Sequence, residues 1–301
     1  MAPKIGYLLP TRERVMEGRP DGGALLDLAQ RAEDRGYDSV WIGDSLFDKP
    51  RHEPLTMLAG IAGRTKRVAL GTAVLLPALR NPVLLAQQAA TVDQLSAGRL
   101  ILGLGIGSGD PGAQAEFVAA GVPFEKRVGR LLESLKLCRA LWSGEPVDWD
   151  GRWQLKGVTL GPEPCRPGGP PLWMGGCSIG SMQRAARYFD GWFPDPREAE
   201  TYGEGWAKVQ DMAATSGRDP SSITAAMYLT LRIDDEVAVA DAHMAAFFDS
   251  YYPGRGAQMK QNKPWFAGSA AGAADYLSAF AEAGVGHFVL RFTGDHDAQL
   301  E

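Results

Sequence analysis

Hydrophobic and polar positions along this chain alternate in a regular succession of short apolar runs and amphipathic segments. The pattern is clearest in residues 68–109, where an apolar run at Val68–Leu76 precedes a helix start at Asn81-Pro82 and a second apolar run at Arg99–Leu104. Continuous apolar runs are typical of parallel strands that are covered on both faces. This segment therefore predicts a strand, a helix and a second parallel strand.

The same succession continues to the end of the chain. The predicted strands cover Ile5–Leu9, Asp38–Gly43, Val68–Leu76, Arg99–Leu104, Pro171–Met174, Asp190–Pro194, Ile223–Leu231 and Gly286–Phe292. The predicted helices include Gly23–Arg35, Pro54–Gly63, Phe124–Trp142, Glu198–Ser216 and Ala270–Ala283. Eight strands that alternate with helices predict an α/β fold, a (β/α)8 TIM barrel, with a doubly wound open sheet as the alternative.

One segment interrupts the alternation. Residues Ser143–Gly169 contain Asp148–Trp153 and end in a stretch rich in proline and glycine, which predicts a turn or small hairpin inserted before strand five. A barrel of this class needs about 250 residues, so we expect residues 1–301 to form a single domain.

Composition narrows the classes of partner. The formal net charge is -5 and no long basic run is present, so neither nucleic acid nor an anionic membrane surface is expected as a partner. The cysteines Cys138, Cys165 and Cys177 lie too far apart for a metal-spaced pair or a disulfide framework, which favours a reducing cytoplasm and predicts no metal site. The N-terminus has no signal-peptide pattern, and no apolar run reaches the roughly 20 residues of a membrane-spanning helix.

Polar residues follow the second predicted strand, where a barrel gathers its reactive groups. Asp44 and Ser45 come first, and His52 and Glu53 lie close behind. An aspartate before a turn often bonds its own backbone, so Asp44 is either a turn residue or a ligand-binding one. His52 is either a solvated loop histidine or a proton donor.

Glycines follow the fourth and fifth predicted strands. The run Gly103–Gly109 has the spacing G-x-G-x-G-x-G, which differs from the dinucleotide fingerprint, and no ordinary helix is expected directly after it. Asp110 follows this run directly. The turn Gly175–Ser178 leads into a helix, so it predicts either a phosphate site or an ordinary helix cap.

Five segments of the chain resemble the luciferase-like monooxygenase superfamily, which contains flavin-dependent and deazaflavin-dependent oxidoreductases. They are Gly71–Pro77 with Arg80-Asn81-Pro82, Leu95–Gly105, Pro171–Ser178, Asp190–Pro194 and Glu282–Phe292. Members of this superfamily are TIM barrels that hold a tricyclic cofactor in the mouth, and many dimerise. The resemblance therefore implies a cofactor-binding barrel and a homodimer.

The resemblance also implies roles for particular residues. Ala73 and Val74, after Thr72, match a non-prolyl cis peptide in a bulge that backs the cofactor ring. The other implied cofactor-binding positions are Asp44 and Ser45 at the ring edge, Gly107 and Ser108 in the strand-four loop, and Gly175, Gly176, Cys177 and Ser178 in the phosphate turn. Some deazaflavin-dependent members have a histidine at the position of Ser45, so this chain departs from their acid chemistry there.

The function implied is that of an oxidoreductase that uses reduced coenzyme F-420 (8-hydroxy-5-deazaflavin) or reduced FMN as a dissociable co-substrate for a small organic substrate. Flavin-using luciferases tend to place an arginine near the strand-four loop, and its absence from this loop favours the deazaflavin. Asp110 and His52 are the candidates for proton transfer, and the loops Pro10–Gly22 and Tyr251–Phe266 are expected to close the substrate side.

Three other functions stay open at this point. The first is an FMN-dependent luciferase-like monooxygenase proper, which uses oxygen. The second is a barrel that binds cofactor with little turnover. The third is a phosphate-binding isomerase or aldolase, which needs a suitable base or a Schiff-base lysine at a strand end. No lysine ends a predicted strand, which disfavours the lysine chemistry.

Overall fold

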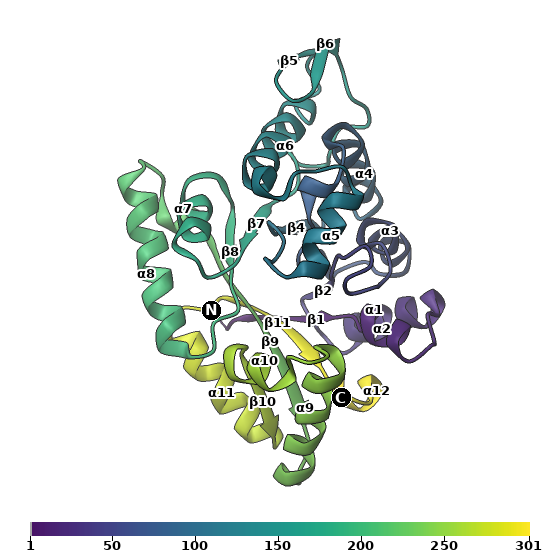
Figure 1. Cartoon of the computed structure of the whole chain (residues 1–301), viewed down its shortest axis with the longest axis vertical. Helices are drawn as coiled ribbons and strands as arrows, with labels where there is room; N and C mark the ends of the chain where they lie inside the picture. The colour runs from purple at the N-terminus through teal and green to yellow at the C-terminus, as the bar shows by residue number, and fades with distance from the viewer. Residues whose placement is uncertain (1) are drawn as a thin grey trace.

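The computed structural model describes residues 2–301 and contains a closed barrel of eight parallel strands (Figure 1). Around the barrel they are β1 (Lys4–Leu8), β2 (Ser39–Ile42), β3 (Ala69–Thr72), β4 (Leu100–Leu104), β7 (Leu172–Gly175), β8 (Gly191–Phe193), β9 (Thr224–Ile233) and β11 (His287–Phe292). The pairing of β8 with β9 and of β11 with β1 closes the wall. The predicted (β/α)8 TIM barrel is confirmed.

Helices alternate with these strands along the chain. The longer ones are α2 (Gly22–Asp34), α3 (Pro54–Arg64), α4 (Pro82–Leu95), α6 (Arg127–Leu141), α7 (Ile179–Tyr188), α8 (Ala199–Thr215), α9 (Val237–Tyr251) and α11 (Ala270–Glu282). The shorter ones are α1 (Thr11–Met16), α5 (Pro111–Ala119), α10 (Gly256–Asn262) and α12 (His296–Gln299), with 3-10 turns at Pro77–Leu79, Phe124–Lys126 and Pro220–Ser222. Helix α4 begins as expected, because the Asn81 side chain accepts from Val83 N at 2.9 Å and Pro82 occupies the first turn.

The insertion before strand five is a hairpin, as predicted. Its strands β5 (Val147–Asp150) and β6 (Gln154–Val158) pair antiparallel in a separate two-stranded sheet. Figure 1 shows this hairpin projecting beyond α6, away from the barrel strands.

The third strand is shorter than the sequence pattern predicts. It ends at Thr72 instead of Leu76, because the chain then leaves the regular ladder and rejoins β4 only through a bridge between Leu75 and Leu104. The peptide bond between Ala73 and Val74 is cis, as the family resemblance implied.

Helices α1, α5 and α12 and strand β10 were not predicted. Helix α5 starts at Pro111, soon after the glycine-rich loop, because proline has the backbone angle that the first helical position needs. Strand β10 (Trp265–Gly268) pairs with the last four residues of β9. Because β9 has ten residues and β8 pairs only with its first two, the far end of β9 has a free edge for β10.

An aromatic cluster fills the interior of the barrel. Trp41 is fully buried, and its ring centre lies 5.2 Å from that of Trp173 and 5.3 Å from that of Phe193. Gly71 makes room for it, since a Cβ there would lie 2.1 Å from the Trp41 ring. The barrel interior is therefore packed, and ligand space is left at the mouth.

A buried histidine joins this cluster to the barrel wall. Ser39 Oγ lies 2.7 Å from His287 Nε2 and accepts the indole N–H of Trp41 at 2.7 Å. Burial lowers the pKa of His287 to about 4, so its imidazole is neutral in the folded protein at neutral pH.

We predict that His287 makes folding stability fall as the pH drops from 6.5 to 4. The unfolded chain takes up the proton near pH 6.5 and the folded chain only near 4, so the contribution is complete above pH 6.5 and is lost below it. The loss is about 1.4 kcal/mol per pH unit. Urea unfolding at several pH values should show a smaller pH slope for His287→Gln than for the natural protein. His243→Gln, on the exposed face of α9, is the control and should leave the slope unchanged; an unchanged slope in His287→Gln would contradict the assignment.

Candidate active site

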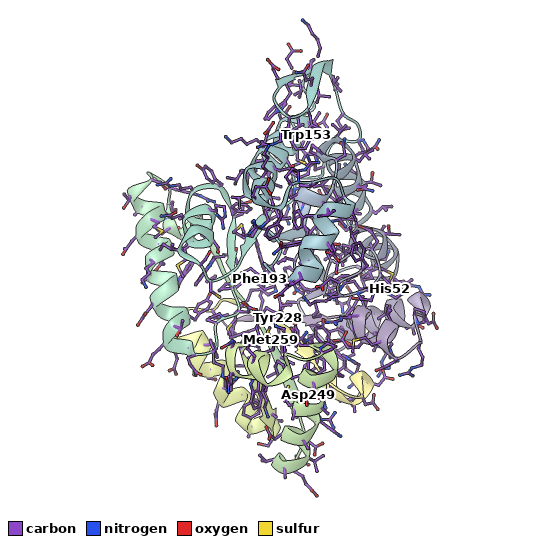
Figure 2. The ribbon with its side chains drawn as sticks, in the orientation of Figure 1. His52, Trp153, Phe193, Tyr228, Asp249 and Met259 are labelled. Carbon is purple, nitrogen blue, oxygen red and sulfur yellow. The ribbon has the colours of Figure 1, made fainter. Side chains whose placement is uncertain are left out.

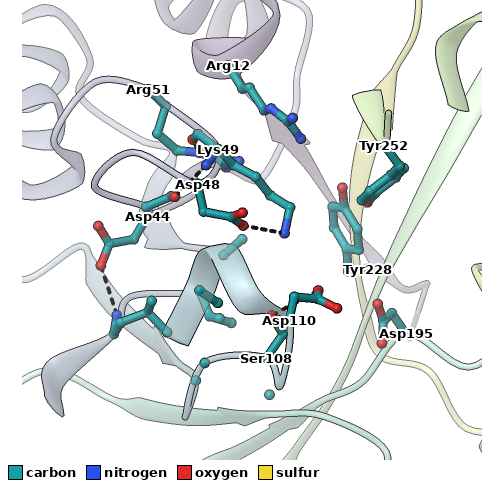
Figure 3. A pocket seen from close by; sticks show the side chains of 18 of the residues that line it. Arg12, Asp44, Asp48, Lys49, Arg51, Ser108, Asp110, Asp195, Tyr228 and Tyr252 are labelled. Atoms are coloured by element: carbon teal, nitrogen blue, oxygen red, sulfur yellow. Dashed lines mark hydrogen bonds and ion pairs between the residues drawn. The ribbon is translucent and has the colours of Figure 1, made fainter. Parts of the chain in front are cut away.

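A cavity of about 530 Å³ opens at the carboxyl ends of the barrel strands. Residues from the loops after β1, β2, β3, β4 and β7 line it, together with residues from the segment between α9 and β10. Figure 3 shows these side chains converging on one space from opposite sides. This is the end of the barrel at which enzymes of this architecture place their active sites.

The floor of the cavity is formed by the bulge after β3. Val74 lies between two glycines: a Cβ on Gly105 would come within 2.5 Å of Val74 Cγ2, and one on Gly175 within 3.1 Å of Val74 Cγ1. Ala73 and Val74 both line the cavity. Because Gly105 and Gly175 have no side chains, Val74 can pack closely against both of them while it faces the cavity.

The Asp44 carboxylate holds this bulge. It accepts the backbone N–H of Leu76 at 2.9 Å and both forks of the Arg80 guanidinium, at 2.5 and 3.0 Å. The side chain of Asp44 is only 3% exposed. Its charge is therefore neutralised within the protein, and its role at the cavity edge is to tie the loop after β2 to the bulge.

Ser45 is held by a glutamate that the sequence analysis did not single out. Glu116 on α5 is 1% exposed, and its Oε1 accepts from Ser45 Oγ at 2.6 Å and from the backbone N–H groups of Phe47 and Asp48 at 2.8 Å each. Ser45 Oγ in turn accepts the N–H of Lys49 at 2.8 Å. These bonds shape the loop after β2.

The strand-four loop brings Asp110 to the cavity. Gly107 has φ +79°, and a Cβ there would lie 2.7 Å from the Phe117 ring, so the turn requires glycine. Ser108 donates to Asp110 at 3.1 Å, and Arg255 donates to the same carboxylate. Burial works against ionisation, but these bonds and the Arg255 charge outweigh it and lower the pKa of Asp110. Asp110 is therefore ionised at neutral pH.

In the turn after β7, some residues line the cavity and others cap helix α7. Gly175 and Gly176 line the cavity. Ser178 caps α7 by accepting the N–H of Ser181 at 3.2 Å, and neither it nor Cys177 is among the lining residues. Burial and the neighbouring Asp195 raise the pKa of the Cys177 thiol to about 11, so it stays protonated.

Two other predicted site residues lie outside the cavity lining. His52 Nε2 is 3.4 Å from the Pro20 carbonyl oxygen, and Figure 2 shows His52 near the edge of the molecule, away from Phe193 and Tyr228. Thr72 is buried and donates to the Gly103 carbonyl at 2.7 Å, which joins β3 to β4. The structure thus brings Asp110, but not His52, to the cavity.

Arg12, Tyr251 and Arg255 line the cavity and lie in the two loops that were expected to close the substrate side. Arg51, Tyr228 and Arg291 line it without having been predicted. Arg291 carries a signal, because it is a charged residue within the apolar run that forms β11. Arg51 and Tyr228 carry none, since only the folded chain brings their segments together.

The residues described, 2–301, include no group of three or more His, Cys, Asp or Glu side chains placed to hold a metal ion. Nor does this part of the chain contain a helix long and apolar enough to cross a membrane.

Comparison with known proteins matches nearly the whole chain to one family. A family model described as luciferase-like monooxygenase matches residues 3–297. An F420-dependent glucose-6-phosphate dehydrogenase of Kineococcus radiotolerans is 34% identical over 231 residues, which cover 72% of this chain and 66% of that protein. A 5,10-methylenetetrahydromethanopterin reductase of Methanolobus tindarius is 30% identical over 213 residues, 70% of this chain and 62% of the relative. The chain thus spans slightly less than two thirds of these relatives.

Solved structures share the fold. An F420-dependent secondary alcohol dehydrogenase superposes with a TM-score of 0.81 at 24% identity, covering 97% of this chain and 94% of that one. A monooxygenase from Streptomyces bottropensis gives 0.82 at 21% identity, covering 99% and 95%. The curated relatives are thus named as oxidoreductases, and the solved structures show the shared fold. Because the family match runs from the first strand of the barrel to beyond its last, the chain belongs to the luciferase-like monooxygenase family, as its resemblance predicted.

Proposed function

We propose that this protein is an oxidoreductase that binds a reduced deazaflavin or reduced FMN in the cavity and acts on a small organic substrate. The observation that carries the proposal is the smooth floor at Val74, between Gly105 and Gly175, at the reactive end of the barrel. Curated relatives that are F420-dependent enzymes support it. The cofactor, when bound, supplies hydride transfer or the activation of oxygen, and the protein supplies position and electrostatics.

The residues present fit such a cofactor. Gly105 and Gly175 leave a surface without side chains on both sides of Val74, which suits a flat ring. Gly176, with φ +106°, precedes α7, whose first-turn N–H groups and dipole favour an anionic group. The residues proposed to hold the cofactor are Asp44, Ser45, Thr72, Ala73, Val74, Gly107, Ser108, Gly175, Gly176, Cys177 and Ser178, with Thr72, Cys177 and Ser178 acting through the backbone that they shape.

Within the proposed site, Asp110 is the residue placed to take up a proton. Its carboxylate is kept ionised by Arg255, and both residues line the cavity. Tyr251, Tyr252 and Lys263 line it from the segment predicted to close the substrate side. These side chains would exclude water from the reacting groups.

Anaerobic titration of the purified protein with FMN, reduced FMN and the oxidised and reduced deazaflavin tests this proposal. We expect saturable binding of at least one reduced cofactor, followed by fluorescence and thermal shift. Binding of the deazaflavin alone would assign hydride transfer, and a preference for reduced FMN would assign monooxygenation. Binding without turnover of any carbonyl, alkene or thioether substrate would leave a cofactor-binding barrel. If no cofactor binds, the proposal is overturned and a phosphate-binding isomerase becomes the favoured function.

Gly176→Ala should weaken cofactor binding by about tenfold, a loss of ~1.4 kcal/mol, because its Cβ would sit 3.0 Å from Ser181 Oγ at a backbone angle that alanine disfavours. Gly217→Ala is the matched control. Gly217 also has a positive φ, +75°, but a Cβ there has no neighbour within 4 Å. Both variants should lose about 1–2 kcal/mol of stability, yet only Gly176→Ala should raise the cofactor Kd. Equal Kd values for Gly176→Ala and the natural protein would remove this turn from the site.

We also propose a homodimer in the cytoplasm. The three cysteines are free, which supports a reducing compartment. The dimer is supported by two exposed leucines on helix α4, Leu84 at 60% and Leu95 at 58% exposure. They are eleven residues apart and therefore lie on the same face of the helix, where they would form an apolar interface. Sedimentation should give about twice the chain mass of 32.3 kDa, and a monomeric mass at micromolar concentration would contradict the dimer.

A further inference from the structure

Six cationic side chains line the cavity, and they differ in whether a carboxylate balances them. Lys49, Arg255 and Lys263 each form an ion pair with an aspartate. The remaining three take part in none of the ion pairs found among residues 2–301. We name them the arginine cluster: Arg12, Arg51 and Arg291.

Two members of the arginine cluster donate hydrogen bonds to groups of the protein. Arg291 donates to Thr230 Oγ1 through Nε at 3.1 Å and Nη2 at 2.8 Å, and its guanidinium lies 4.4 Å from the ring centre of Tyr251. Arg51 donates to the Lys49 carbonyl at 3.0 Å and to the Tyr251 hydroxyl at 3.3 Å. These two arginines therefore contribute mainly charge to the cavity.

Arg12 is different, because its guanidinium lacks hydrogen-bond partners. The residue is 6% exposed, and its guanidinium carbon lies 4.0 Å from the ring centre of Tyr251. Its Nε and Nη1 are buried without any acceptor. Figure 3 shows the side chain extending from α1 into the space between Lys49 and Tyr252. Among the six cationic side chains of the cavity, only that of Arg12 has no acceptor within residues 2–301, so a ligand in the cavity is placed to supply one.

The charge around Arg12 points to an anion. The carboxylate of Glu13 interacts electrostatically with the arginine cluster but forms no ion pair with any of its members. The Oε1 atom of Glu13 is itself buried without a hydrogen-bond partner. Burial raises the pKa of Glu13 even against the opposing effect of Arg291 and Arg51. Guanidinium groups in a low-dielectric site remain charged, so the cluster keeps a net positive charge that a bound anion would balance.

The planar guanidinium of Arg12 suits a carboxylate. A single guanidinium can satisfy both oxygens of a carboxylate through two parallel N–H groups. Arg51 and Arg291 already donate to groups of the protein, whereas Arg12 has no acceptor within it. Tyr228 and Tyr252 line the same side of the cavity and suit an aromatic or unsaturated body next to the carboxylate.

We propose that Arg12, supported by the charge of Arg51 and Arg291, binds the carboxylate of the substrate, and that this enzyme acts on small organic acids. The proposal deepens the proposed function, because it takes the same cavity as the site of reaction. It places the acid on the wall formed by α1 and α9, whereas the cofactor is proposed to lie on the glycine-lined floor.

Calorimetric titration of the full chain, without added cofactor, tests this assignment with benzoate, its neutral analogue benzamide and phenyl phosphate. We expect benzoate to bind about tenfold more tightly than benzamide, as a hydrogen bond between charged groups implies. Arg12→Gln should abolish this preference, and Arg12→Lys, which keeps the charge but not the planar fork, should retain part of it. Arg14→Gln, on the same short helix but outside the cavity lining, is the matched control and should retain all of it.

A second arm separates this proposal from the proposed function. Arg12→Gln should leave the Kd of the cofactor unchanged, since Arg12 is assigned to the acid. Equal binding of benzoate and benzamide, tighter binding of phenyl phosphate, no benzoate binding at all, or loss of cofactor affinity in Arg12→Gln would each overturn the carboxylate site. If neither cofactor binds the natural protein, the proposed function fails, while the benzoate preference and its loss in Arg12→Gln still decide the anion site.

Discussion

The mouth of this barrel depends on the buried ion pair between Asp44 and Arg80. Asp44 is almost excluded from water, and its carboxylate is satisfied by the Arg80 guanidinium and the N–H of Leu76. Removal of Arg80 would leave the Asp44 carboxylate buried without a charged partner, which is costly. The pair therefore keeps the bulge after β3 against the loop after β2, and Val74 on that bulge between Gly105 and Gly175.

Two chemically different walls meet above this floor. One consists of backbone and small residues around Gly105 and Gly175, with Val74 between them. The other consists of Arg12, Arg291 and the tyrosines around them, carried by β9, β11 and the helices α1 and α9. Under the proposed function the first wall suits a flat cofactor and the second an anionic acid, which would allow two ligands to meet in one cavity.

The parts of the site that the sequence predicted are those with a local cause. Gly107 and Gly176 are needed for positive φ angles in short turns, so their positions after predicted strands already placed them at the mouth. The cis bond at Ala73–Val74 came from resemblance to a family, since no local pattern announces it. Glu116 and Arg255 were missed, because their partners Ser45 and Asp110 lie 71 and 145 residues away along the chain.

The sequence alone determined the order of the eight barrel strands and of the longer helices, and the class of fold, because apolar periodicity, helix caps and glycine stops act within a few residues. Tertiary structure decided where β3 ends, where β10 pairs, and which charges are neutralised. These depend on which distant segments meet: β10 uses an edge left free by the length of β9, and Arg12 lacks a partner only because no carboxylate folds against it. Contacts between such distant segments are set by the packing of the whole barrel, which no local sequence pattern encodes.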